Sequence, residues 1–285
     1  GNLVKFVPKR PPAVVEAEGD RIVVDLMKVP KLARDPKVRW LLGVFSPILG
    51  IRTIETDRDH LYVKLRATPA GLPEAIGKLR EKIATFNPDV LVVVGDDQHE
   101  NLVDDNMPPF TIFMGEEVEA SLSLRYLNQA KSENRTKYRV ATKIAEGLVN
   151  GLMEEGFDPS YSKKTRYDGG LGHAFARVLK FVSPQAKHAV VPVMVNTYYP
   201  PAPSAQRCVH FGRALANVLR RIPGDQRVVV VGSGGLSHTK IDEQLDHEFI
   251  QALKLNDMNY MAAMRASDLV EGTSEIRNWL VTAAA

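Results

Sequence analysis

The chain has 285 residues, of which 44% are hydrophobic and 25% are charged, a composition typical of a folded globular protein. The formal net charge of +3 is close to neutral for this length, so charge gives no reason to expect a nucleic-acid partner. The single cysteine excludes an intramolecular disulfide and a cysteine-built metal site. No apolar run approaches the roughly 20 residues of a membrane helix, and the first residues contain no apolar leader, so we expect a cytoplasmic protein.

The first third of the chain begins with an arm rich in proline and charge. We expect residues 1–35 to be irregular, with one short strand at "RIVVDLM". The segment "VRWLLGVF" at 38–45 predicts the first buried strand. Apolar residues at helical spacing over 72–86 predict an amphipathic helix. The continuous apolar run at 88–97, flanked by turn residues, predicts a fully buried parallel strand.

The rest of the chain alternates between buried strands and helices, which predicts an α/β fold with a mostly parallel central sheet flanked by helices. No internal repeat or low-complexity linker is visible, so we predict a single domain over 36–285. The last helix runs into Ala285 without a stop signal, which suggests that this end is incomplete. The expected elements are helices at 138–157, 209–222, 242–255 and 274–285 and strands at 188–196 and 226–235.

Two of the buried strands end in polar residues of the same character. One continues into "GDDQHEN" and reaches His99, and the other continues into "GSGGLSH" and reaches His238. In open α/β sheets, ligands bind beyond the carboxyl ends of the strands. Glycines directly after a strand allow a sharp turn and the close approach of a ligand. We therefore expect both histidines to face a cleft.

Each histidine also has a structural interpretation, since a single histidine after a strand is most often a loop residue with a satisfied hydrogen bond. Two histidines at equivalent strand ends make that interpretation weaker. The segment "GSGG" is also compatible with a dinucleotide-binding turn. It lacks the third glycine of that motif, and no acidic residue follows at the end of a next strand.

A third histidine, His173, lies beside glycines in "DGGLGHAF", and Glu275 opens a helix behind a Gly-Thr-Ser turn. The helix dipole alone favours an acid at that place, and Ser274 is a possible cap. Histidines combined with one carboxylate are also what a non-haem Fe(II) site requires, because two histidines and a carboxylate leave open positions for substrate and oxygen.

These segments occur in an order that resembles the LigB-type class III extradiol dioxygenases, the family of the protocatechuate 4,5-dioxygenase catalytic subunit. The resemblance covers roughly residues 85–285. The segments that carry it are "DDQHEN", "GHAF", "VNTYYPPAPSAQRCVHFG", "GSGGLSH" and "SEIRNWL".

The resemblance implies a ring-opening enzyme that uses non-haem Fe(II) and O2 on a catechol-like aromatic acid. Matched residue by residue, it implies His99 and Glu275 as metal ligands, His238 as the catalytic acid–base and His173 as a further active-site histidine. A neutral imidazole suits removal of a hydroxyl proton from the catechol and its later return. The family also implies a homodimer or a heterodimer.

Four further residues are candidates for substrate binding: Asn196, Tyr198, Arg207 and Ser237. Ser237 and the surrounding glycines would position His238 without crowding the ring. Arg207 is equally compatible with a structural role and with contact to a substrate carboxylate. The tyrosines of "NTYYPP", Tyr198 and Tyr199, are better explained by packing than by catalysis.

One family ligand is missing from this sequence. The family places a histidine in an "SH-P" motif after the first strand, whereas here Ser46 is followed directly by Pro47. His60 is a possible replacement from a rearranged loop. Alternatively, the sequence has lost residues near Ser46. A third explanation is that the chain is a relative that no longer binds iron.

Two other functions remain open. One is a non-catalytic partner subunit of a two-subunit dioxygenase, which predicts no stable metal and tight association with a catalytic chain. The other is an oxygen-independent lyase or hydrolase that uses His238 as a general base, which predicts turnover without oxygen consumption. The retention of four candidate groups at one site favours the dioxygenase.

Overall fold

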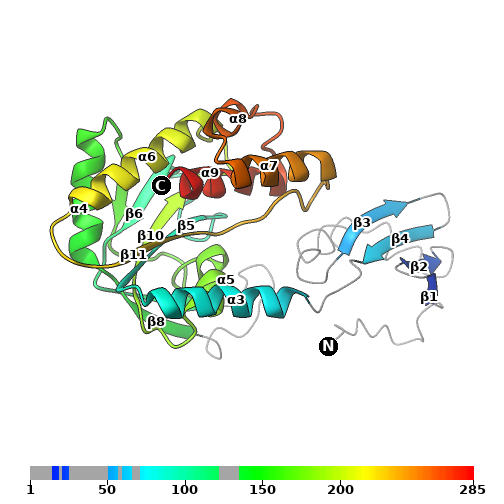
Figure 1. Ribbon diagram of the computed structural model, residues 1–285, viewed down its shortest axis with the longest axis horizontal. Coiled ribbons are helices and arrows are strands. Elements are labelled where there is room, and N and C mark those ends of the chain that lie inside the picture. The colour runs from blue at the N-terminus through cyan, green and yellow to red at the C-terminus, as the bar shows by residue number, and fades with distance from the viewer. Residues whose placement is uncertain (1–14, 19–20, 26–50, 57–59, 66–70, 122–134) are drawn as a thin grey trace. The chain divides into compact units, whose positions relative to one another are not determined.

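The computed structural model describes residues 15–18, 21–25, 51–56, 60–65, 71–121 and 135–285, with side chains from residue 74 onward (Figure 1). The chain divides into two compact units. One comprises residues 74–236 and 243–285, and the other comprises residues 1–73 with 237–242. No helix of the described residues is long and apolar enough to cross a membrane.

The N-terminal unit contains a four-stranded antiparallel sheet in the order β1-β2-β4-β3. The strand expected at "RIVVDLM" is present as β2, and β1 precedes it within the arm. The boundary at residue 35 stays a prediction, and the strand expected at 38–45 lies outside the described residues. The strands are β1 (Val15–Glu18), β2 (Arg21–Asp25), β3 (Ile51–Thr56) and β4 (His60–Leu65).

The larger unit is built on a five-stranded sheet in the order β11-β5-β10-β6-β9. Three of its four strand pairs are parallel, and only β10 and β6 are antiparallel. The predicted α/β fold with a mostly parallel central sheet is therefore confirmed. The strands are β5 (Val90–Asp96), β6 (Phe110–Phe113), β9 (Ser160–Ser162), β10 (Ala189–Val195) and β11 (Val228–Gly232).

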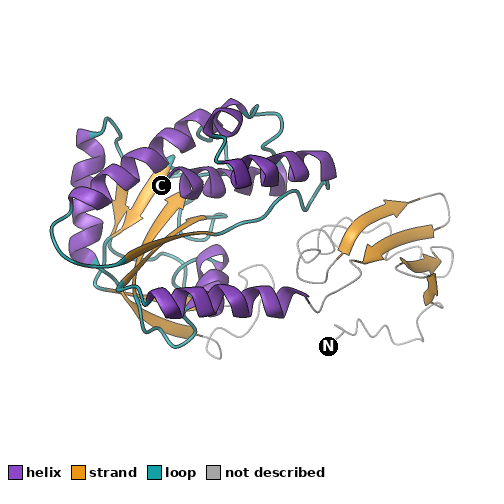
Figure 2. Cartoon of the chain, viewed as in Figure 1, coloured by secondary structure: helices purple, strands orange, loops and turns teal. Residues whose placement is uncertain are grey.

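Helices cover both faces of this sheet, as the layered arrangement in Figure 2 shows. Alternate residues of β5 belong to different core clusters, with Val92 on one face and Leu91 and Val93 on the other. This alternation with apolar residues on both faces explains the continuous apolar sequence of the strand. Helices α4, α6, α7, α8 and α9 contribute to the first cluster, and α3 and α5 contribute to the second.

Most helices lie where the sequence predicts them, with shifted ends. The helix expected at 138–157 begins at Thr142, because Arg135–Arg139 forms strand β8 and pairs with β7. Helix α6 begins at Ala205, since Ser204 caps it by accepting a hydrogen bond from the Arg207 N–H. The remaining bounds are α3 (Gly71–Phe86), α4 (Thr142–Glu154), α5 (His173–Val182), α6 (Ala205–Arg221), α7 (Glu243–Leu255), α8 (Met258–Ala263), η2 (Glu271–Glu275), α9 (Ile276–Ala284), and strand β7 (Glu117–Ser121).

Candidate active site

A pair of carboxylates lies beyond the carboxyl end of β5, between its two parallel neighbours β10 and β11. Asp96 is the last residue of β5 and is 1% exposed, and Glu275 is the last residue of η2 and is partly buried. The amide nitrogen of Gln98 lies 2.9 Å from Asp96 Oδ2 and 3.2 Å from Glu275 Oε1. One side-chain amide therefore donates to both carboxylates.

The pKa of Glu275 reflects its burial beside a second carboxylate. Burial raises its pKa well above the usual range, and the negative charge of Asp96 raises it further. Hydrogen bonds from Gln98 and from the Gly235 backbone N–H, and the positive charge of Arg177, act in the opposite direction without cancelling the effect. A carboxylate in such surroundings is stabilised by a proton or by a bound cation.

The glycine-rich turn after β11 packs directly against Glu275. Gly234 has a φ of +98°, and a Cβ there would lie 2.9 Å from the Cβ of Glu275. Both the backbone conformation and the contact therefore require glycine. Ser233, just before it, is buried and donates its hydroxyl to the backbone oxygen of Ala174. The small residues of "GSGG" thus allow the strand end and the η2–α9 segment to meet closely.

Asn278 completes what we call the carboxylate cluster, defined as Asp96, Gln98, Glu275 and Asn278. It lies one helical turn after Glu275, is fully buried, and donates its amide nitrogen to Asp96 Oδ1 at 3.0 Å. Its amide oxygen is buried and has no hydrogen-bond partner among the described residues. Turning the amide over would place that oxygen against a carboxylate, so the unsatisfied acceptor is a consequence of Asp96.

His173 begins α5 and is held by Glu100, which is 3% exposed. Glu100 accepts hydrogen bonds at 3.1 Å from the backbone N–H of His173, and its Oε1 lies 3.1 Å from the ring Nδ1. Burial lowers the pKa of His173, but the hydrogen bond and charge of Glu100, with the charge of Asp96, outweigh it and raise the pKa overall. Glu100 therefore orients the imidazole ring and favours its charged form.

His99 faces a different group of residues. Its ring stacks on Tyr199, with centroids 3.5 Å apart and planes 6° from parallel, and its Nε2 lies 3.2 Å from Asp104 Oδ1. Its φ of +57° is left-handed. Among the described residues, no group of three or more histidine, cysteine, aspartate or glutamate side chains is arranged to hold a metal ion. The role of His99 as a metal ligand beside Glu275 stays a prediction.

The candidate substrate-binding residues have different surroundings. Asn196 closes a turn, donating to the backbone oxygen of Tyr199 and accepting from its N–H. Burial raises the pKa of Tyr198, and so do the charges of Glu275 and Asp96, so its hydroxyl stays protonated beside the carboxylate cluster. The guanidinium of Arg207 lies 3.9 Å from the ring centroid of Phe157, which is a structural contact.

Ser237 and His238 belong to the segment Ser237–Asp242, which is grouped with the N-terminal unit. The Ser237 hydroxyl accepts a hydrogen bond from the Asp242 N–H at 2.8 Å and so closes this loop. The acid–base role of His238 stays a prediction. His60 is the first residue of β4, and the region of Ser46 lies outside the described residues.

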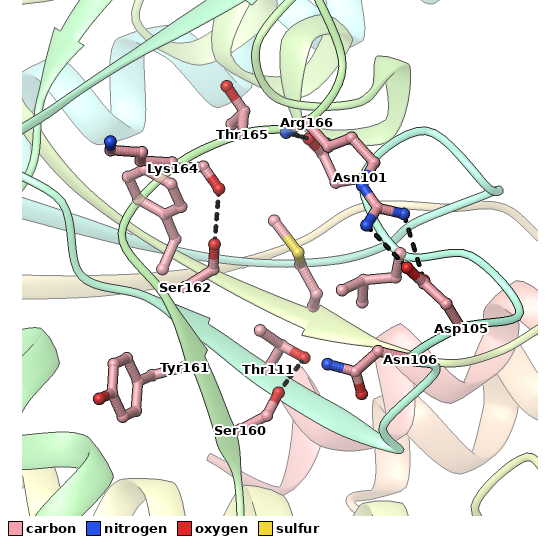
Figure 3. A pocket seen from close by; sticks show the side chains of 13 residues that line it. Asn101, Asp105, Asn106, Thr111, Ser160, Tyr161, Ser162, Lys164, Thr165 and Arg166 are labelled. Carbon is pink, nitrogen blue, oxygen red and sulfur yellow. Dashed lines mark hydrogen bonds and ion pairs between the residues drawn. The ribbon is translucent and has the colours of Figure 1, made fainter.

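A polar cavity of about 210 Å³ lies beside β6 and β9 (Figure 3). Two pairs of its polar side chains bind one another: Thr111 and Ser160 share a hydrogen bond of 2.6 Å, and Arg166 forms a bidentate ion pair with Asp105. The Ser162 hydroxyl donates to a backbone oxygen. The lining residues are Asn101, Leu102, Asp105, Asn106, Thr111, Phe113, Ser160, Tyr161, Ser162, Lys164, Thr165, Arg166 and Met194.

Comparison with known families gives a match over residues 67–285 to the family described as the catalytic LigB subunit of aromatic ring-opening dioxygenase. The chain belongs to the LigB family. All members of the carboxylate cluster, together with Glu100 and His173, lie within the matched residues. The resemblance found in the sequence motifs is therefore confirmed at the level of the family.

Two related proteins carry the name 2,3-dihydroxyphenylpropionate/2,3-dihydroxicinnamic acid 1,2-dioxygenase. The protein from Comamonas testosteroni is 29% identical over 204 residues, which are 70% of this chain and 56% of that protein. The second, enzyme 2 from Pseudomonas putida, is 32% identical over 166 residues, or 58% of this chain and 48% of that protein. The chain thus spans about half the length of these relatives. A solved structure of an uncharacterized Escherichia coli K12 protein aligns with a TM-score of 0.46 at 16% identity, covering 74% of this chain and 81% of that one.

The LigB family implies a non-haem iron, and the described residues fit a divalent cation only in part. In favour of a cation are two neighbouring carboxylates and the unsatisfied Asn278 oxygen. The ring of His99 stacks on Tyr199, and the amide of Gln98 donates to Glu275. The described residues therefore offer Asp96 and Glu275 as two neighbouring carboxylates for a cation.

Sequence reasoning missed Asp96, Gln98, Glu100 and Asn278. The signal for Asp96 was its place as the first polar residue after a buried apolar strand. The signal for Asn278 was its spacing of three residues from Glu275, which places both on one helix face. Ser274 does not cap α9, because its buried hydroxyl has no hydrogen-bond partner among the described residues.

Proposed function

We propose that this chain is the catalytic part of a ring-opening extradiol dioxygenase that acts on a catechol-like aromatic acid with O2. The carboxylate cluster carries the proposal, because it lies inside the LigB-matched region at the sheet edge where α/β enzymes bind ligands. The named substrates of the relatives, 2,3-dihydroxyphenylpropionate and 2,3-dihydroxicinnamic acid, support an aromatic acid with adjacent hydroxyls. Assembly as a dimer or heterodimer and a cytoplasmic location belong to the same proposal.

In this proposal Glu275 is the carboxylate that holds the metal, which the family implies to be non-haem Fe(II). The metal would supply the positive charge that binds an ionised diol and the redox chemistry that activates oxygen. Glu275 suits this role because burial and the charge of Asp96 disfavour its negative charge, which a cation would stabilise. The backbone N–H of Gly235 and the amide of Gln98 donate hydrogen bonds to its carboxylate.

The proton transfers are assigned to histidines. Glu100 stabilises the charged form of His173 and raises its pKa, so His173 would serve as a hydrogen-bond donor to a substrate oxygen. His238, which follows the turn packed on Glu275, would accept the first hydroxyl proton and return it later. Tyr198 remains a neutral hydrogen-bond donor, since burial and the nearby carboxylates raise its pKa.

The test is oxygen consumption by the purified chain, loaded with metal without oxygen and then mixed with aerated 2,3-dihydroxyphenylpropionate. The proposal predicts about one O2 consumed per ring opened, with both atoms of labelled ¹⁸O2 recovered in the product. Turnover without oxygen uptake would point to the lyase or hydrolase. Absence of turnover together with stable binding to a second, catalytic chain would identify a partner subunit.

A further inference from the structure

The first turn of α5 lies against the ends of two neighbouring strands of the central sheet. The ring of Phe175 packs on Gly95, the last residue but one of β5, where an added Cβ would lie 3.1 Å from the ring. Ser233, the residue after β11, donates its hydroxyl to the backbone oxygen of Ala174 at 2.8 Å. These two contacts place the beginning of α5 beside the strand ends that surround the carboxylate cluster.

Arg177 lies on the same face of α5 as His173, because residues four apart in a helix lie one above the other. The ring of His173 is turned toward Glu100, with 3.1 Å between Nδ1 and Oε1. Arg177 is half-buried and follows His173 by roughly 6 Å along the helix axis. It is therefore the next long side chain on the helix face that supplies a histidine to the candidate active site.

The positive charge of Arg177 acts on that site. Burial and the charge of Asp96 raise the pKa of Glu275, and the charge of Arg177 opposes them. Burial lowers the pKa of His173, and Arg177 adds to this effect, although Glu100 and Asp96 outweigh both. The guanidinium is thus within electrostatic reach of Glu275 and His173. Within the part of the chain that the structure describes, Arg177 forms no hydrogen bond or ion pair.

Two other arginines are less suited to bind a substrate. Arg277, two residues after Glu275, is buried, and its guanidinium donates to backbone oxygens of the surrounding loops. Arg207, the sequence candidate for contact with a substrate carboxylate, lies with its guanidinium 3.9 Å from the ring centroid of Phe157. Both guanidinium groups therefore have structural contacts, whereas that of Arg177 keeps its hydrogen-bonding capacity for a ligand.

We propose that Arg177 binds the carboxylate of the aromatic substrate and so selects catechols that carry an acidic arm. The proposal rests on the function proposed above, since it concerns the same substrate. In 2,3-dihydroxyphenylpropionate, after which the relatives are named, the arm is attached to the ring carbon next to the diol. A diol held at Glu275 and His173 leaves the carboxylate free to reach along α5 to Arg177. A guanidinium suits this role because its parallel N–H groups match the two oxygens of a carboxylate.

The test compares oxygen uptake by the metal-loaded chain with 2,3-dihydroxyphenylpropionate and with 3-propylcatechol, which has an arm of the same length without the carboxylate. In Arg177→Gln, kcat/KM for the acid should fall about 10- to 100-fold, mostly through KM, because one charged hydrogen-bonded pair is lost. The value for 3-propylcatechol should stay within about threefold of wild type. Lys180→Gln, which removes an exposed cation from the same helix, is the matched control and should leave both values unchanged.

A second variant, Arg177→Lys, keeps the charge but not the paired N–H groups, so its loss for the acid should lie between wild type and Arg177→Gln. An equal loss for both substrates, or a loss for neither, would overturn the proposal. Calorimetric binding of the two compounds without oxygen gives the same comparison independently of turnover. Wild type that binds the acid no more tightly than 3-propylcatechol would also overturn the proposal. Acid-selective binding that Arg177→Gln abolishes, without ring opening in wild type, would contradict only the proposed function.

Discussion

The carboxylate cluster and the polar cavity belong to the same sheet, yet they satisfy their polar groups in opposite ways. In the cavity, hydroxyls pair with hydroxyls or backbone oxygens, and Arg166 pairs with Asp105. In the cluster, two carboxylates share one Gln98 amide, and the buried Asn278 oxygen is unsatisfied among the described residues. Unpaired buried acceptors are rare in folded proteins because each costs free energy.

The size of a cavity and the reactivity of the residues around it are therefore separate properties. The cavity offers about 210 Å³, and contacts within the fold join Thr111 to Ser160 and Arg166 to Asp105. In the cluster, burial and the charge of Asp96 raise the pKa of Glu275 well above its usual range. We therefore propose that the chemistry takes place at the cluster.

The largest expected effect is on the reaction. Glu275→Gln keeps the size of the side chain but removes its charge, so ring opening should fall by more than about 100-fold, beyond the loss typical of residues that only support a metal ligand. Initial rates of oxygen uptake at saturating metal measure it. Glu271→Gln, in the same short helix and exposed, is the control and should retain activity. Equal rates in wild type and Glu275→Gln would remove the cluster from the reaction.

Gly172→Ala should destabilise the fold by about 1–3 kcal/mol, because the new Cβ would collide with the Glu100 carboxylate that holds His173. Urea unfolding gives the free energy. Gly77→Ala is the matched control: this exposed helical glycine has no atom within 4 Å of an added Cβ, so alanine should stabilise the helix by up to about 1 kcal/mol. An unchanged free energy of unfolding in Gly172→Ala would contradict the described position of Glu100.

Glu100→Gln should lower the pKa of His173 below its usual value, because burial then acts without the compensating charge. Proton NMR of the imidazole measures the titration. In wild type the folded pKa is raised, so the stability contributed by His173 is complete below about pH 6.5 and is lost as pH rises through the folded pKa. The variant should therefore lose more unfolding free energy at pH 5.5 than at pH 9. An equal loss at both values would mean that Glu100 does not stabilise the charged ring.

The smallest effect is expected in the cavity. Ser160→Ala removes one partly buried hydrogen bond to Thr111 and should cost about 1 kcal/mol of unfolding free energy. Ring opening should not change, because the hydrogen bond between Ser160 and Thr111 supports the fold. A large loss of activity in this variant, with an unchanged thermal midpoint, would show that the cavity takes part in the reaction and would weaken the contrast between the two regions.

The sequence predicted the central sheet well because its strands are continuous apolar runs, as in Val90–Asp96 and Ala189–Val195. It failed at Arg135–Arg139, where a charged segment with one buried tyrosine becomes a strand through pairing with β7. Such pairing depends on a distant segment, so local pattern carries little of it. The three residues of strand β9 form no sequence pattern that predicts a strand.

The sequence predicts which strand ends and turns form the candidate site, but it does not predict how their side chains meet. The strand ends, the glycine turn and Glu275 all lie where motif and topology indicate. The contact of Gln98 with Glu275 could not be read from the sequence, because it depends on the turn that Asp97 closes with three backbone N–H groups. Likewise, Glu100 gains its role only because α5 brings His173 to it.

The decisive measurement is a crystal structure of the full chain, loaded with metal and grown without oxygen in the presence of 2,3-dihydroxyphenylpropionate. We expect the substrate diol beside Glu275 at the carboxylate cluster, and no substrate in the polar cavity beside Ser160. Substrate held in the polar cavity, with none at the carboxylate cluster, would contradict this assignment.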